Sequence, residues 1–180
     1  MLKKEIERLY EDFVEREGLN ISLNFIMPKG YENAFGTFDV CKNTLFLNQN
    51  LMTEGKKVRM LFTLYHELYH AKQYLHREKF DEKVKKSIDY VVLYDGSAFK
   101  LCEGEWKEGR LINCEFEFVE VYKNLPYEIQ ANEFAYDKVK QMVSQKDKSE
   151  LERIYIQSKP TIEIPYEKMQ KIFEQIDKIV

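Results

Sequence analysis

The chain has 180 residues, of which 44% are apolar and 33% are charged, so it can bury a core without disulfides or a structural metal. The formal net charge of -3, from 28 basic and 31 acidic residues mixed along the chain, gives no excess of positive potential that would hold a nucleic acid. No apolar run approaches the ~18 residues of a membrane span, and the charged start lacks a signal peptide's apolar stretch. We therefore expect a cytoplasmic protein that binds neither membranes nor nucleic acid. Cys41, Cys102 and Cys114 form no CxxC pair, which argues against a disulfide framework or a thiolate zinc site.

The first half of the chain predicts a helix, a small sheet and a second helix. Apolar residues recur at helical spacing over residues 1–17, and Gly18 is a helix stop. Residues 21–27 and 36–48 are rich in β-branched and aromatic residues, with a turn at Lys42 and Asn43, and predict an antiparallel sheet. Residues 53–75 predict a helix with one packed face, made by Leu61, Leu64, Leu68 and Leu75.

The second half is less regular. Residues 89–96 and 112–122 resemble strands joined across the turn-prone segment 103–109, which predicts a β-hairpin inserted at about 81–125. Pro126 begins a predicted helix of about 17 residues. A charged stretch, a short strand at 161–164 and a helix starting near Pro165 complete the chain. These elements predict an α+β fold in a single domain, 1–180.

His66-Glu67-Leu68-Tyr69-His70 is an HExxH motif. Histidines at i and i+4 project from one helix face, so two imidazoles can share a metal ion. The leucine face lies on the opposite side of the same predicted helix. Glu67 is too close to its neighbour to be a good third ligand, but it can take a proton from a metal-bound water. The motif therefore predicts a zinc site with Glu67 as general base.

A catalytic zinc needs a third protein ligand and an open position, and the chain offers two candidates for that ligand. His76 reproduces the histidine spacing of the metzincin signature. In that signature a glycine turns the chain between the second and third histidines, whereas this chain has Gln73 there in good helix-forming sequence. A histidine near the end of an ordinary helix is the simpler interpretation of His76.

Glu128 is the second candidate for the third ligand. On a helical wheel it shares the apolar face of its helix with Asn132, whereas Glu133 and Asp137 point outward. A buried carboxylate needs a partner or a metal ion. Asn132 could accept the free N–H of a ligand histidine. A first-turn carboxylate favoured by the helix dipole, beside a buried amide bonded to backbone, would give the same pattern without a metal.

Two segments carry a resemblance to a known family. FTLYHELYHA, followed downstream by EIQANEFA, resembles the HExxH and ExxANxFA helices of ImmA/IrrE-type zinc metallopeptidases, and LFLNQNL is similar to the strand before their active-site helix. The resemblance implies a zincin-like fold. It also implies that His66, His70 and Glu128 bind Zn²⁺, that Glu67 is the general base and that Asn132 supports a ligand. Two features differ: Tyr69 stands where the family usually has glycine, and an insertion at 81–125 would account for the long gap before Glu128.

The predicted chemistry is metal-assisted peptide hydrolysis. Glu67 would take a proton from zinc-bound water and pass it to the leaving amine. Tyr69, Tyr74, Tyr136 and His76 are all candidate oxyanion donors, and the sequence does not choose among them. The strand ending at Asn48, if it lies at a sheet edge, could pair with an extended substrate. The resemblance implies a protein or peptide substrate, with a DNA-binding repressor of bacteria or their mobile elements as one example.

Three alternatives remain open. A SprT-like or metzincin-type peptidase would also use an HExxH helix, although the acidic balance and the lack of a cysteine pair disfavour the SprT-like interpretation. A protein-binding module could hold zinc without catalysis. A phage or transposon interaction protein would need no metal at all. Intact Glu67 favours an enzyme, because a purely structural zinc site needs no base.

Overall fold

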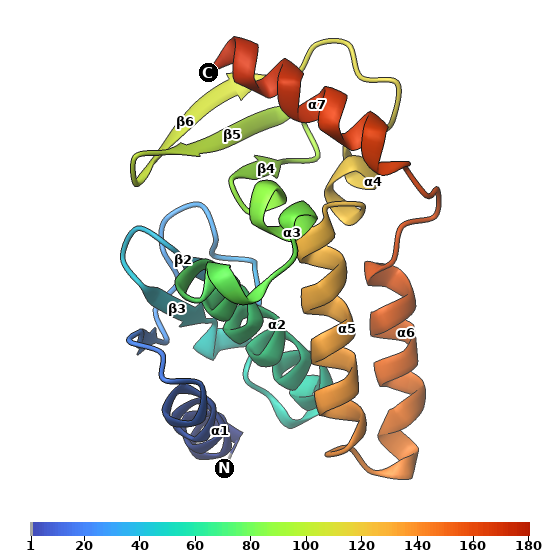
Figure 1. The fold of residues 1–180 in the computed structure, drawn as a ribbon. Coiled ribbons are helices and arrows are strands. Elements are labelled where there is room, and N and C mark those ends of the chain that lie inside the picture. Colours follow the sequence, from blue (N-terminus) through green and yellow to red (C-terminus); the bar gives the residue numbers. More distant parts are fainter. Residues whose placement is uncertain (1) are drawn as a thin grey trace. The chain divides into compact units, whose positions relative to one another are not determined.

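A computed structural model describes residues 2–180 of the chain, which divide into two compact units. The first unit runs to Arg77 and also contains Ala131–Ile156, whereas the second consists of Glu78–Gln130 and Gln157–Val180. Helices and two small sheets make this an α+β protein, as predicted (Figure 1). The single domain with an inserted hairpin stays a prediction. No helix within residues 2–180 combines the length and apolar character that crossing a bilayer requires.

The N-terminal part of the first unit contains two long helices and three strands. They are α1 (Leu2–Glu17), β1 (Ser22–Asn24), β2 (Gly36–Asp39), β3 (Thr44–Leu47) and α2 (Lys57–Leu75). The predicted first helix is therefore confirmed from Leu2, while Met1 lies outside the described residues. Gly18, at φ +65°, ends it in a Schellman motif: its N–H donates to the Glu15 carbonyl, and the Leu19 N–H donates to the Val14 carbonyl.

The sheet of the first unit is mixed, so the prediction of an antiparallel sheet is wrong in part. Its strand order is β1-β3-β2, in which β2 pairs antiparallel with β3 but β1 pairs parallel with it. The β2–β3 hairpin turns at Asn43, which has a φ of +46°, as the sequence predicted. Residues 25–35 return the chain to β2 as a long loop, and that connection permits the parallel pairing.

Helix α2 packs its predicted apolar face into the core of the first unit. Leu61, Leu64 and Leu68 are buried, and Leu75 is half-buried against the same core. Gly36 of β2 approaches α2 so closely that an added Cβ would lie 2.8 Å from the Thr63 methyl group. Phe38 of β2 also contacts the ring of Tyr74. The sheet and the HExxH helix are therefore firmly packed together.

Helix α5 (Pro126–Lys140) begins at Pro126, as predicted, and helix α6 (Lys148–Ser158) comes next in the chain. Ala131, Asn132, Ala135 and Val139 are buried, whereas Glu133, Asp137 and Lys140 are exposed, as the helical wheel predicted. The helix ends at Lys140, and Met142 beyond it is exposed. Helix α6 forms from the charged stretch that the sequence analysis left unassigned.

The second unit contains a three-stranded antiparallel sheet and helices. Its elements are α3 (Glu82–Ser87), β4 (Tyr90–Val92), β5 (Ser97–Cys102), β6 (Glu105–Arg110), α4 (Phe118–Lys123) and α7 (Tyr166–Ile179). Strands β5 and β6 form a hairpin with a two-residue turn at Glu103 and Gly104, both at positive φ (Figure 1). The last helix begins after Pro165, as predicted.

Two strand predictions in this region are wrong. Residues 112–122 form a loop and five of the six residues of α4, because β6 follows the turn at once and uses residues 105–110 instead. Residues 161–164 form no strand, because their backbone bonds to α4. The carboxylate of Glu120, which is 5% exposed, accepts from the Thr161 hydroxyl and from the N–H groups of Thr161 and Ile162. Asn124 also binds this segment: its side chain donates to the Ile162 carbonyl and accepts from the Ile164 N–H.

Candidate metal centre

Helix α2 brings the two histidines of the motif together. His66 and His70 lie one turn apart, and their Nε2 atoms are 2.9 Å from each other, with the ring planes nearly perpendicular at 84°. His66 is half-buried and stacks on Phe62, whereas His70 is 6% exposed. Both rings therefore direct the same nitrogen to one point beside the helix, which is the arrangement the i, i+4 spacing predicted.

Glu128 supplies a third donor to this group. It stands in the first turn of α5 and is 4% exposed, and a carboxylate oxygen of Glu128 and one ring nitrogen from each histidine all lie within 4.8 Å of one another. The three side chains could therefore hold a metal ion. Glu133, the neighbouring carboxylate that points outward, is exposed.

The donor set agrees with a divalent metal ion of borderline softness. Two imidazoles and one carboxylate are the protein ligands of many catalytic zinc sites, and three ligands leave a position of a tetrahedral ion open. Burial of His70 and Glu128 reduces the competition of water for these donors.

Gln73 contacts a candidate ligand, and the sequence analysis noted it only as a departure from the metzincin pattern. Its Oε1 lies 2.9 Å from His70 Nδ1, and its side chain is fully buried. An amide oxygen can only accept a hydrogen bond, so Nδ1 of His70 is the donor and its Nε2 carries the lone pair. The i, i+3 spacing of His70 and Gln73 on one helix was the available sequence signal.

Glu67 and Asn132 belong to the two helices that carry the candidate ligands. Glu67 directly follows His66 on α2 and is half-buried. Asn132 lies one turn after Glu128 on α5 and is 7% exposed. The observed acceptor for His70 Nδ1 is Gln73, so support of a histidine by Asn132 remains a prediction.

His76, the alternative third ligand, has a different partner. It caps the C-terminus of α2, and its Nε2 lies 2.9 Å from the Glu17 carbonyl oxygen at the end of α1. Helix α2 continues through Gln73 to Leu75, as its composition predicted. The metal-ligand group contains Glu128 and not His76.

The tyrosines that are candidate oxyanion donors make different contacts. The Tyr136 hydroxyl donates to Glu152 of α6, and the Tyr136 ring stacks on Tyr155. This bond and the burial of the hydroxyl raise the Tyr136 pKa above its usual value. Tyr69 stacks on Phe134, and Tyr74 contacts Phe38 of β2. None of these contacts selects one donor.

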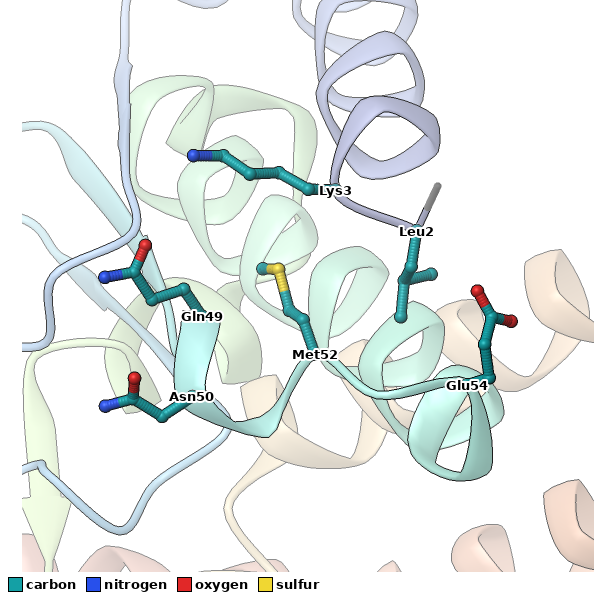
Figure 2. Close-up of a pocket in the computed structure, with 6 residues that line it drawn as sticks. All are labelled: Leu2, Lys3, Gln49, Asn50, Met52 and Glu54. Atoms are coloured by element: carbon teal, nitrogen blue, oxygen red, sulfur yellow. The ribbon is translucent and has the colours of Figure 1, made fainter.

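A separate pocket lies in the first unit. It has a volume of about 460 Å³ and is lined by Leu2, Lys3, Gln49, Asn50, Met52 and Glu54. Figure 2 shows one lysine, one glutamate and two amides around the side chains of Leu2 and Met52. The Lys3 ammonium also lies 4.3 Å from the centre of the Phe25 ring. None of the three candidate metal ligands lines this pocket.

Comparisons with known proteins do not assign the chain to a family. No protein-family model, no curated protein and no solved structure matches it.

Proposed function

We propose that this protein is a zinc-dependent peptidase in which His66, His70 and Glu128 bind the metal ion. The observation that carries this proposal is the convergence of their three donor atoms within 4.8 Å. Glu67 follows directly after a ligand, where a general base of an HExxH peptidase stands. The resemblance of the two helices to ImmA/IrrE-type sequences supports the same residue roles. Zinc is proposed because two imidazoles and one carboxylate are its usual ligands in hydrolases.

The metal ligands and Glu67 would have different roles in hydrolysis. A bound zinc ion would lower the pKa of a water molecule and polarise the peptide carbonyl. Glu67 would accept a proton from water as the oxygen of that water adds to the peptide carbonyl carbon. It would then deliver the proton to the nitrogen of the leaving amine as the C–N bond breaks. His66, His70 and Glu128 would hold the reacting groups in place beside Glu67.

An extended segment of polypeptide is the substrate that the first unit fits best. Strand β3, which was predicted to end at Asn48, ends at Leu47 and is the central strand of its sheet, so it is not available for pairing with a substrate. Strand β2 is an edge strand and packs on α2 through Gly36 and Phe38. A peptide that adds to β2 would gain backbone hydrogen bonds, which restricts substrates to exposed or locally unfolded segments. A DNA-binding repressor is a proposed example, because the resembled family acts on such proteins.

The decisive test combines metal content with hydrolysis in a Glu67→Gln variant. Wild type should bind one zinc ion per chain and cleave an unfolded protein such as reduced casein. Glu67→Gln should retain the metal ion and lose about 100- to 10,000-fold in rate, the usual contribution of a general base. Glu133→Gln, which changes an exposed carboxylate of α5, is the matched control and should behave as wild type.

Other outcomes would identify a different protein class. Zinc binding without hydrolysis of any unfolded protein by wild type would indicate a non-catalytic zinc module. No zinc binding by wild type would overturn the proposal. Hydrolysis by Glu67→Gln at the wild-type rate would retain a peptidase but remove Glu67 as its base.

A further inference from the structure

Gln73 and His70 form a buried pair on the helix that carries the motif. Gln73 Oε1 lies 2.9 Å from Nδ1 of His70, while Nε2 on the other side of the same ring lies 2.9 Å from Nε2 of His66. Gln73 is fully buried and His70 is 6% exposed, so water competes little for this bond. Both residues belong to α2 and to the first unit.

The chemistry of these partners determines which nitrogen of His70 carries hydrogen. A neutral imidazole has one N–H and one lone pair, and an amide oxygen has no hydrogen to donate. The bond to Gln73 therefore requires an N–H at Nδ1 and leaves the lone pair of His70 at Nε2. That lone pair lies on the side of the ring where Nε2 of His66 is 2.9 Å away.

We infer that Gln73 is a positioning residue that holds His70 in the Nδ1–H tautomer, with its Nε2 lone pair directed at the metal site. This inference rests on the proposed metal-dependent function. Hydrogen bonds to the second nitrogen of a ligand histidine fix its tautomer and ring orientation, and their loss usually costs 10- to 100-fold in metal affinity.

The identity of residue 73 also affects the path of the chain. In the metzincin pattern a glycine at this position lets the chain turn and bring a third histidine to the metal. A glutamine continues the helix, so α2 extends to Leu75 and directs His76 to the Glu17 carbonyl instead. Position 73 is therefore part of a continuous helix, and His76 beyond it contacts α1.

The tautomer can be measured directly in the metal-free wild-type protein. The chain has three histidines, so long-range ¹H–¹⁵N correlation spectra can be assigned with His66→Gln and His76→Gln variants. We expect Nδ1 of His70 to be protonated and its Nε2 to be unprotonated. A neutral His70 with its hydrogen on Nε2 would overturn the inference, whatever the protein does with zinc.

Metal affinity provides the second measurement, by competition with a chromophoric chelator at fixed pH. Gln73→Leu, which removes the acceptor at similar volume, should weaken Zn²⁺ binding by about 10- to 100-fold and mix the His70 tautomers. Gln73→Glu keeps an acceptor oxygen and should bind within a few-fold of wild type. Gln141→Leu changes an exposed glutamine of the same unit and serves as the control.

Two results would contradict the role of Gln73 in binding. The first is a folded Gln73→Leu protein with wild-type affinity, and the second is a Gln73→Glu protein as weak as Gln73→Leu. Failure of wild type to bind Zn²⁺ would instead refute the proposed metal site, whereas the tautomer measurement would still decide whether Gln73 orients His70.

Discussion

The Nε2 atoms of His66 and His70 lie 2.9 Å apart on one face of α2. Two imidazoles at this distance share one small space, and Glu128 contributes a carboxylate oxygen to the same group. Placing three polar side chains together and largely out of water is costly unless they bond to one another or to an ion. Because of this free-energy cost, the two histidines and Glu128 are best explained together. Glu128 is 58 residues further along the chain than His70.

The first prediction concerns the carboxylate ligand. Glu128→Ala should weaken Zn²⁺ binding by more than the ~10- to 100-fold that loss of an outer hydrogen bond costs, because a direct ligand is removed. Glu133→Ala, five residues along the same helix and exposed, should bind as wild type. Chelator competition measures both affinities. In addition, zinc at 100 times its Kd should stabilise wild type by about 2.7 kcal/mol but not Glu128→Ala at the same concentration. Equal affinities in the two variants would exclude Glu128 as a ligand.

The second prediction separates this site from the metzincin alternative. His76→Ala should retain one zinc ion per chain, because the His76 ring contacts the Glu17 carbonyl rather than the candidate site. It should reduce the free energy of unfolding by about 1 kcal/mol, through loss of a hydrogen bond between the ends of α1 and α2. Metal content by mass spectrometry and urea denaturation measure the two effects. Loss of zinc from folded His76→Ala would favour the metzincin interpretation.

The elements that sequence analysis predicted well have long, regular patterns. Helix α1 has an amphipathic repeat and a glycine stop, and α5 has one clear buried face, whereas α2 is buried on most sides. The same regularity identified His66, His70 and Glu128 as candidates, because spacing on a helix determines which side chains share a face. Three-dimensional proximity of α2 and α5 is a property of the fold, and the sequence alone did not contain it except through the resemblance.

The failures come from short segments and from single polar residues. Residues 115–122 alternate between polar and apolar in the manner of a strand, but Phe118, Val121 and Tyr122 also fit helical spacing, and Glu120 is held by Thr161 and Ile162. Over so few residues the two periods cannot be distinguished. Gln73 was missed as a partner because a glutamine inside a helix is ordinarily solvent-exposed. Its importance follows from its contact with His70.

The third prediction concerns the packing of the edge strand on the motif-bearing helix. Gly36→Ala would place a methyl group 2.8 Å from the Thr63 methyl and 2.9 Å from the Phe46 carbonyl oxygen. Because the Phe46 backbone cannot move away without disturbing the sheet, we expect a loss of about 1–3 kcal/mol in the free energy of unfolding. Gly55→Ala is the matched control, since open space surrounds its added methyl. Urea denaturation compares the two, and a Gly36→Ala protein as stable as the control would show that β2 and α2 can separate without cost.

The fourth prediction concerns the acid sensitivity of the second unit. Burial raises the pKa of Glu120, but hydrogen bonds from the Ile162 N–H and from the hydroxyl and N–H of Thr161 outweigh it and lower that pKa below its usual value. A lowered folded-state pKa means that the charged carboxylate stabilises the fold above the unfolded-state pKa of about 4.3. This stabilisation is lost as the pH falls through the lower, folded-state pKa.

Glu120→Gln should therefore lower the free energy of unfolding at neutral pH. It should also make the free energy of unfolding change less as the pH falls. The amide can accept at one oxygen only and presents an NH₂ group to the remaining donors, so we expect a loss of about 1–3 kcal/mol at pH 7. Glu117→Gln, which alters an exposed carboxylate at the start of the same helix, should leave both quantities unchanged. Urea denaturation between pH 3 and pH 7 tests this. If Glu120→Gln destabilises by the same amount at both ends of the range, the carboxylate's charge is not what holds Thr161 and Ile162 against α4.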